Sequence, residues 1–117
     1  MSEAIYIVGG ARTPMGGLMG DLAPVSAPEL GSTAIKAAVE RSNLDAAMVD
    51  EVFMGCVLPA GLKQCPARQA AIGAGIPKAA GAVTVNKAWG SGMQATIFGY
   101  DSIVAGTNKV VVAGGME

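Results

Sequence analysis

The fold is decided by one stretch, Ala82-Val83-Thr84-Val85-Asn86-Lys87-Ala88-Trp89-Gly90-Ser91-Gly92-Met93-Gln94-Ala95-Thr96. Val83 and Val85 alternate with the polar Thr84 and Asn86, which is the period of a strand. Gly90 and Gly92 follow, and we expect them to form a turn too tight for a Cβ atom. The residues after this turn continue as a helix. Position 89, occupied by tryptophan, therefore lies where the carboxyl end of a strand meets a helix N-terminus, and α/β proteins bind ligands at such junctions.

Outward from this stretch, the sequence predicts an alternation of strands and helices. Ser26 and Glu29 form an S-x-x-E capping box, which indicates the start of a helix. The predicted helices cover residues 27–41, 66–75 and 91–105, and the predicted strands cover residues 4–9, 49–58, 82–86 and 109–113. Residues 49–58 are nearly all apolar, as in a strand that is covered on both faces. Such an order predicts a parallel α/β architecture with right-handed crossovers, and we expect the apolar helix after position 91 to be buried.

The composition argues against several classes of protein. The chain has 117 residues and a net charge of -1, and 51% of its residues are hydrophobic while only 15% are charged. Clustered positive charge that would bind nucleic acid is missing from the sequence. No apolar run reaches the roughly 18 residues of a membrane span. The small number of charged residues indicates a chain that buries a face against something else, rather than a free-standing domain.

Three side chains outside the central stretch are candidates for chemistry. Arg12 follows the first predicted strand, and we expect it to fasten a loop by donating hydrogen bonds to backbone carbonyls. Cys56 lies within a predicted strand and is interpreted as a small core residue. Cys65 precedes a helix, where a thiol can become reactive, but the chain has no histidine to pair with it. We interpret it as a structural thiol, and reduced cysteines without metal-ligand spacing favour a cytoplasmic protein with no metal site.

Five segments, in order, resemble the thiolases, the acetyl-CoA acetyltransferase family. They are GGARTPMGG at 9–17, ELGSTAIKAAVERS at 29–42, VDEVFMGCVLPAGLKQCPARQAA at 49–71, VNKAWGSGMQAT at 85–96 and KVVVAGGME at 109–117. The resemblance implies a thiolase-like α/β fold, of which residues 1–117 would form a partial N-terminal domain with a βαβαβαβ order and a mainly parallel sheet. The last strand of that half, the loop domain and the C-terminal half would lie outside this sequence, and we expect their absence to leave an exposed sheet edge and an uncovered helix.

The resemblance also implies a chemistry for position 89. In thiolases a cysteine at the place of Trp89 carries the acyl group, a second cysteine deprotonates another acetyl-CoA, and coenzyme A thioesters are substrates, with no separate cofactor. Trp89 has no nucleophilic atom, and its indole N–H donates but cannot accept a proton. Its backbone N–H remains a candidate oxyanion donor, and Gly90, Ser91 and Gly92 are expected to shape the substrate approach. We expect the indole to fill the acyl pocket or strain the turn, and this chain alone to be inactive.

Two other functions compete with a truncated acetyltransferase. The chain could be a non-catalytic, thiolase-like structural subunit that needs a partner chain. It could also be a dinucleotide-binding module, because Gly90-Ser91-Gly92-Met93-Gln94-Ala95 fits G-x-G-x-x-A and Glu117 follows at the end of a strand, where a ribose-binding acid would lie. As partners we expect acyl-CoA in the intact family, and either a homo-oligomer formed through the strand around Val83 or a complementing C-terminal chain, with no nucleic acid and no membrane.

Overall fold

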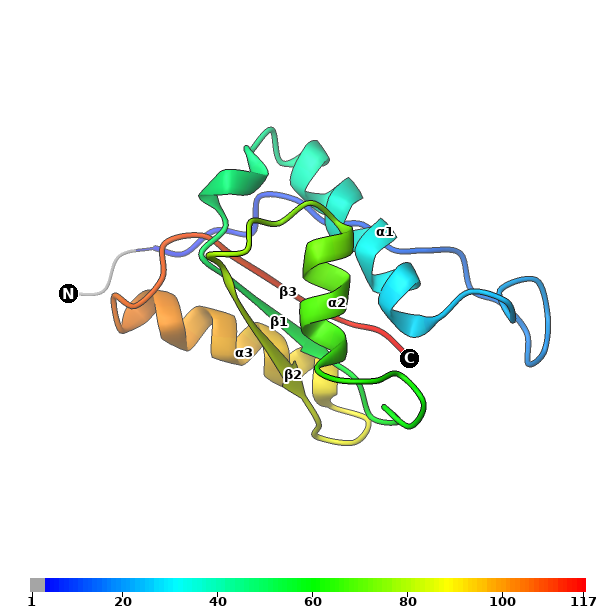
Figure 1. Cartoon of the computed structure of the whole chain (residues 1–117). Helices are drawn as coiled ribbons and strands as arrows, with labels where there is room; N and C mark the ends of the chain where they lie inside the picture. The colour runs from blue at the N-terminus through cyan, green and yellow to red at the C-terminus, as the bar shows by residue number, and fades with distance from the viewer. Residues whose placement is uncertain (1–3) are drawn as a thin grey trace.

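A computed structural model describes residues 4–117, which form one three-stranded sheet with helices on both faces (Figure 1). In chain order the elements are α1 (Ala27–Arg41), the 3-10 helix η1 (Ala46–Met48), β1 (Glu51–Gly55), α2 (Pro66–Gly73), β2 (Gly81–Val85), α3 (Ser91–Val104) and β3 (Val111–Gly115). The predicted α/β class and the three predicted helices are confirmed, within two residues at each end. In the described part of the chain, no helix is long and apolar enough to cross a membrane.

The sheet is parallel throughout, with the strand order β2-β1-β3. Glu51 at the start of β1 aligns with Gly81 on one side and Val111 on the other, and Gly55 at its end aligns with Val85 and Gly115. β1 is therefore the central strand, and its Val52 is completely buried. This burial explains why residues 49–58 are nearly all apolar, the pattern from which we predicted a strand covered on both faces.

Two separate cores hold the helices to the sheet. On one face, α1 and α2 pack against Val52 and Met54 of β1, and this core holds most of the buried side chains. On the other face, α3 packs through Ala95 against Phe53 and Val85. Figure 1 shows α1 and α2 on one side of the strands and α3 on the other. The second core is much the smaller, because only one helix contributes to it.

The predicted strand at residues 4–9 is not present. This segment has no regular secondary structure, and its apolar residues face solvent, with Ile7 90% exposed. A strand is stable only when its backbone N–H and C=O groups pair with a neighbour, and in the described chain no strand pairs with this segment. The local sequence therefore favours an extended backbone, but this segment does not join the sheet. The sheet has three strands instead of the four that we predicted.

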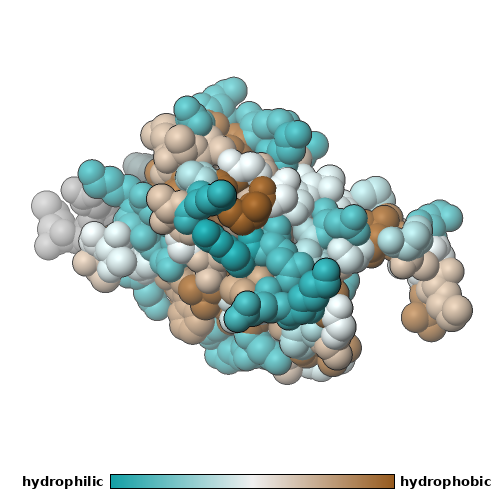
Figure 2. Space-filling model, in the orientation of Figure 1, coloured by the Kyte–Doolittle hydropathy of each residue, from teal (hydrophilic) through white to brown (hydrophobic). Residues whose placement is uncertain are grey.

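The apolar pattern of α3 is typical of a buried helix, and the expectation that a helix is left uncovered in this chain is confirmed. Only the side that carries Ser91, Ala95 and Gly99 is buried against the sheet. The opposite side exposes Met93, Ile97, Tyr100 and Val104, and Met93 is 69% exposed. The loop before α1 projects on the right of Figure 2, where apolar surface is visible. Leu18 and Met19 of this loop are 97% and 89% exposed. Much of the apolar composition is therefore uncovered surface, as expected for a chain that buries a face against something else.

Candidate functional site

The junction between β2 and α3 consists of residues 86–90, which we call the elbow. It lies at the carboxyl end of the parallel sheet, next to the end of β1. The end of β1 and the start of α3 lie close together there, since a Cβ atom on Gly55 would be only 2.7 Å from the Cβ atom of Ser91. Glycine at the end of β1 thus allows the N-terminus of α3 to rest directly on the central strand.

Side chains from both ends of the elbow fix its backbone. The hydroxyl of Ser91 accepts a hydrogen bond from the Lys87 N–H at 2.9 Å and donates one to the Ala88 carbonyl at 2.7 Å. The carboxamide oxygen of Asn86 accepts from the Ala88 N–H at 3.1 Å. These bonds hold Ala88 at a φ of 44°, a left-handed conformation that costs a non-glycine residue roughly 1–2 kcal/mol. The elbow is therefore a constrained turn rather than a flexible link.

The constrained turn points the side chain at position 89 away from the protein. Trp89 is fully exposed, at 105% of its reference area, so within the described chain its indole fills no pocket. The other expected effect of the indole, strain in the turn, stays a prediction. The N-cap residue of the adjacent α3 is Gly90, which offers no side chain to cap the helix. The first N–H groups of a helix have no intrahelical partner, and of these the Ser91 N–H donates to the Ala88 carbonyl at 3.2 Å.

The two glycines of the elbow motif do not have the role that we predicted from the sequence. Gly90 has a φ of -95°, and a Cβ atom there would meet only the Lys87 carbonyl oxygen, at 3.5 Å. A Cβ atom on Gly92 would meet nothing within 4 Å. The expected turn too tight for a Cβ atom is wrong for both positions in this chain, because Ala88 carries the left-handed turn instead. The absence of a side chain at Gly92 leaves open space above the first turn of α3.

A shallow groove of about 470 Å³ adjoins the elbow and lies between the outer side of β2 and α3. Val83 and Phe98 form its apolar part. Lys87 and Gln94 border it, and the Lys87 ammonium donates to the Gln94 amide oxygen at 2.9 Å. The groove thus offers an apolar strip that reaches the elbow at Asn86 and Lys87, with polar groups at that end.

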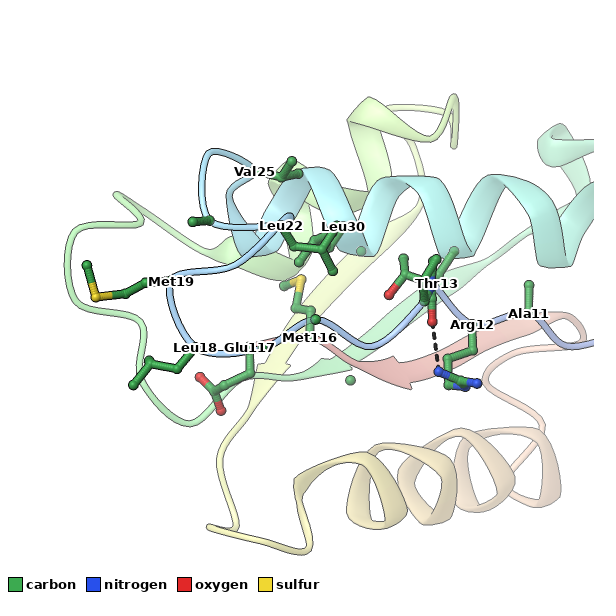
Figure 3. Close-up of a pocket in the computed structure, with 17 residues that line it drawn as sticks. Ala11, Arg12, Thr13, Leu18, Met19, Leu22, Val25, Leu30, Met116 and Glu117 are labelled. Atoms are coloured by element: carbon green, nitrogen blue, oxygen red, sulfur yellow. Dashed lines mark hydrogen bonds between the residues drawn. The ribbon is translucent and has the colours of Figure 1, made fainter.

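A larger cavity of about 550 Å³ lies between the N-terminal loop, the start of α1 and the end of β3 (Figure 3). Arg12 lines it, and its guanidinium donates to the carbonyl of Thr13 at 2.9 Å, as the dashed line in Figure 3 marks. The prediction that Arg12 fastens a loop through a backbone carbonyl is confirmed. Leu22, Leu30 and Met116 add apolar walls.

Glu117 performs a function that sequence reasoning missed. Its carboxylate accepts hydrogen bonds from the backbone N–H groups of Val57 at 3.1 Å and Leu58 at 2.9 Å. It thereby ties the end of β3 to the loop after β1, and these bonds occupy the group that the dinucleotide hypothesis assigned to a ribose. The one signal in the sequence for this structural role is that Glu117 follows a predicted strand.

The two cysteines are not placed as nucleophiles. Cys56 is 1% exposed, as predicted for a core residue. Burial raises the pKa of its thiol, and the charge of Glu117 adds to the shift. Cys65 caps α2 in a left-handed conformation, and its sulfur lies 3.7 Å from the Thr84 hydroxyl and 3.9 Å from the Ala82 carbonyl oxygen. Cys65 thus packs between α2 and β2, which agrees with its interpretation as a structural thiol.

Comparison with known proteins explains nearly the whole chain at once. The family model of the thiolase N-terminal domain matches residues 5–117. Acetyl-CoA acetyltransferase 2 of Arabidopsis thaliana is 57% identical over 113 residues, which are 97% of this chain and 28% of the relative. An acetyl-CoA acetyltransferase of Schizosaccharomyces pombe is 53% identical over 117 residues, which are 100% of this chain and 30% of the relative. This chain therefore spans less than a third of the length of these relatives.

The solved structures give the same result. The crystal structure of the Acat5 thiolase from Ascaris suum in complex with coenzyme A superposes with a TM-score of 0.92 at 41% sequence identity, and the match covers 94% of this chain and 29% of the other. The G-x-G-x-x-A match that suggested a dinucleotide-binding module thus lies within the match to the thiolase N-terminal domain. The sequence and fold comparisons agree, and the chain belongs to the thiolase family, whose N-terminal domain it matches.

Proposed function

We propose that this chain is the N-terminal part of an acyltransferase that makes or cleaves acetoacetyl-CoA, and that it is inert by itself. The observation that carries the proposal is the elbow, which presents residue 89 between the end of β2 and the uncapped N-terminus of α3. Residues 1–117 would form a partial N-terminal domain, completed by a further strand, a loop domain and a C-terminal half. The relatives that match, with more than three times this length, support that division.

The elbow is suited to a thiolate at position 89. The partial positive charge at a helix N-terminus stabilises an anion next to it, and the backbone N–H of residue 89 would help to bind the thioester oxygen as charge develops on it. A thiolate would attack the thioester carbon of acetyl-CoA and release the coenzyme A thiolate, which leaves the acetyl group on the enzyme. Open space above Gly92 gives the pantetheine arm a path to this position.

Trp89 removes this step. Its indole has no lone pair that can act as a nucleophile, and loss of the nucleophile in an enzyme with covalent catalysis lowers the rate by roughly 10⁶. For the completed protein we propose coenzyme A thioesters as substrates, with no separate cofactor. The Ascaris suum thiolase, whose crystal structure contains coenzyme A, supports this substrate class.

Two surfaces would be covered in the completed protein. The outer edge of β2 has unpaired backbone groups, and we propose that a second copy pairs with it in a homo-oligomer. The exposed side of α3, which carries Met93, Ile97, Tyr100 and Val104, would be covered by the C-terminal half or by a complementing C-terminal chain. The free cysteines support a cytoplasmic location, and neither nucleic acid nor a membrane is expected as a partner.

A chimera tests the proposed function. Residues 1–117 are joined to the part of the Arabidopsis thaliana relative that follows the matched region, with and without Trp89→Cys. We expect the Trp89→Cys chimera to cleave acetoacetyl-CoA in the presence of coenzyme A, and the unchanged chimera to lose roughly 10⁶ of that rate. A folded but inactive Trp89→Cys chimera, beside an active parent enzyme, contradicts the proposal.

A non-catalytic, thiolase-like subunit is the second candidate, because the indole of Trp89 and the apolar side of α3 are both exposed. In that case Trp89 would contact a partner chain instead of blocking a reaction. The same chimera distinguishes the two. A subunit whose elbow serves only to bind a partner would gain no turnover from Trp89→Cys, and Trp89→Ala would weaken its binding to a partner chain.

A further inference from the structure

Side-chain hydrogen bonds join the carboxyl ends of all three strands and lead to the elbow. Glu117, after β3, binds the N–H groups of Val57 and Leu58, which follow β1. The carbonyl of Val57 accepts from the amide nitrogen of Asn86 at 3.3 Å, and the amide oxygen of Asn86 accepts from the Ala88 N–H at 3.1 Å. We call these five residues the strand-end network.

We propose that Glu117 and Asn86 are positioning residues that set the left-handed backbone of Ala88, and with it the direction of the N–H and the side chain at position 89. The purpose of this positioning rests on the proposed function, because that function uses the N–H of residue 89. The geometry of the hydrogen bonds is independent of the proposed function. Every contact in the network lies within the described chain.

Ala88 needs such support because its own conformation is unfavourable. At a φ of 44° an alanine is strained relative to an ordinary helical backbone, because its Cβ atom approaches the following carbonyl oxygen. Asparagine two residues earlier offers a side-chain acceptor to the Ala88 N–H, the bond that an Asx turn uses. Without it, Ala88 would return to a negative φ, and the peptide group between Ala88 and Trp89 would rotate.

Glu117 acts on Ala88 through Asn86. A carboxamide has two ends, and the one that donates to the Val57 carbonyl fixes the orientation of the other, which accepts from Ala88. Val57 is itself held by a charge-assisted bond to Glu117, and such bonds are roughly twice as strong as neutral ones. The carboxylate at the end of β3 therefore sets the position of the carbonyl that orients Asn86.

The sheet itself does not need this network. The backbone ladder already continues past the strands, because the Cys56 N–H donates to the Val85 carbonyl and the Met116 N–H donates to the Gly55 carbonyl, both at 2.9 Å. The network begins where this ladder ends. Ser91 holds the elbow from the other side, through Lys87 and the Ala88 carbonyl, so loss of Asn86 should loosen the turn without unfolding the protein.

Nuclear magnetic resonance of the 117-residue chain tests the proposal through the Ala88 amide. In Asn86→Ala we expect hydrogen exchange at Ala88 to become about tenfold faster, since one hydrogen bond is lost, and the three-bond HN–Hα coupling of Ala88 to change as φ changes. Asn86→Asp keeps an acceptor for the Ala88 N–H but loses the donor to Val57, so its effect should be smaller. Trp89, the sole tryptophan, reports the same change through its fluorescence anisotropy.

Glu117→Ala separates positioning from stability. We expect faster exchange at Val57, Leu58 and also Ala88, and the double variant with Asn86→Ala should exchange at Ala88 no faster than Asn86→Ala alone. Glu117→Gln, which keeps one acceptor, should restore part of the protection. Glu40→Ala, a change at an exposed carboxylate of α1, is the control and should leave Ala88 unchanged.

Two results would overturn the proposal. One is unchanged exchange and coupling at Ala88 in Glu117→Ala, while Val57 and Leu58 lose protection. The other is an additive effect of the two substitutions, which would mean that they act independently. Neither measurement involves acyl transfer, so the network can fail while the acyltransferase function holds, and an inactive chimera leaves the network intact.

Discussion

Replacing Trp89 by cysteine in the 117-residue chain should create a thiol that is more reactive than an ordinary exposed one. Because the indole is fully exposed, its removal leaves no cavity, and the free energy of unfolding should change by no more than about 0.5 kcal/mol. The new thiolate would lie beside the N-terminus of the 14-residue α3. At an exposed site, a helix N-terminus stabilises an anion by roughly 0.3–1 kcal/mol, which corresponds to about a two- to fivefold larger thiolate fraction near neutral pH.

The assay is the rate of alkylation by iodoacetamide as a function of pH, with each cysteine followed by peptide mass spectrometry. Tyr100→Cys is the matched control, because it places a thiol on the same helix at an exposed position away from the N-terminus. Cys56 should react slowest, since it is buried and its pKa is raised. Equal rates at positions 89 and 100 would refute the reasoning that the elbow favours an anion at position 89.

The packing and charges of the sheet lead to three more expectations. Gly55→Ala should destabilise the protein by roughly 1–3 kcal/mol in urea unfolding, because its Cβ atom would lie 2.7 Å from that of Ser91. Gly92→Ala, whose Cβ atom would meet nothing within 4 Å, should be neutral or stabilising. Equal changes in the free energy of unfolding for the two variants would contradict this packing argument. The backbone N–H groups of Lys109 and Val110, just before β3, lower the pKa of Asp50. Its stabilising effect is therefore present above its unfolded pKa and is lost as the pH falls through its lower folded pKa. Asp50→Asn should therefore lose less stability on acidification than the unchanged protein, as thermal unfolding at several pH values would detect, and an equal loss would count against it. Val83→Lys should weaken self-association through the edge of β2 in sedimentation equilibrium, and an unchanged oligomer would place the interface elsewhere.

Local signals in the sequence predicted most of the fold. The capping box at the start of α1 is confirmed by both of its hydrogen bonds, from the Glu29 N–H to the Ser26 hydroxyl and from the Ser26 N–H to the Glu29 carboxylate. The all-apolar run at 49–58 contains β1, the central strand. The capping box depends on residues close together in the chain. The central strand depends on burial of a whole element, and the pattern of apolar residues records such burial.

The features that were missed depend on contacts that sequence periodicity does not record. Residues 4–9 have the composition of a strand, but a strand also requires a neighbour. The apolar circumference of α3 is typical of a buried helix, and the described chain covers only the side against the sheet, as expected where part of the fold lies outside this sequence. The elbow was located correctly, yet its left-handed residue is Ala88 rather than a glycine, because hydrogen bonds from Asn86 and Ser91 replace the freedom that glycine would supply.

The most direct test of the proposed function is to look for an acyl group on residue 89. The chimera with Trp89→Cys is incubated with acetyl-CoA, and the peptide that contains residue 89 is analysed by mass spectrometry, beside the unchanged chimera. We predict that this peptide gains the mass of one acetyl group in the Trp89→Cys protein and gains nothing in the protein that keeps Trp89. An acetyl group at another residue, or none in a folded Trp89→Cys chimera, would contradict the claim that this elbow is built to carry an acyl group.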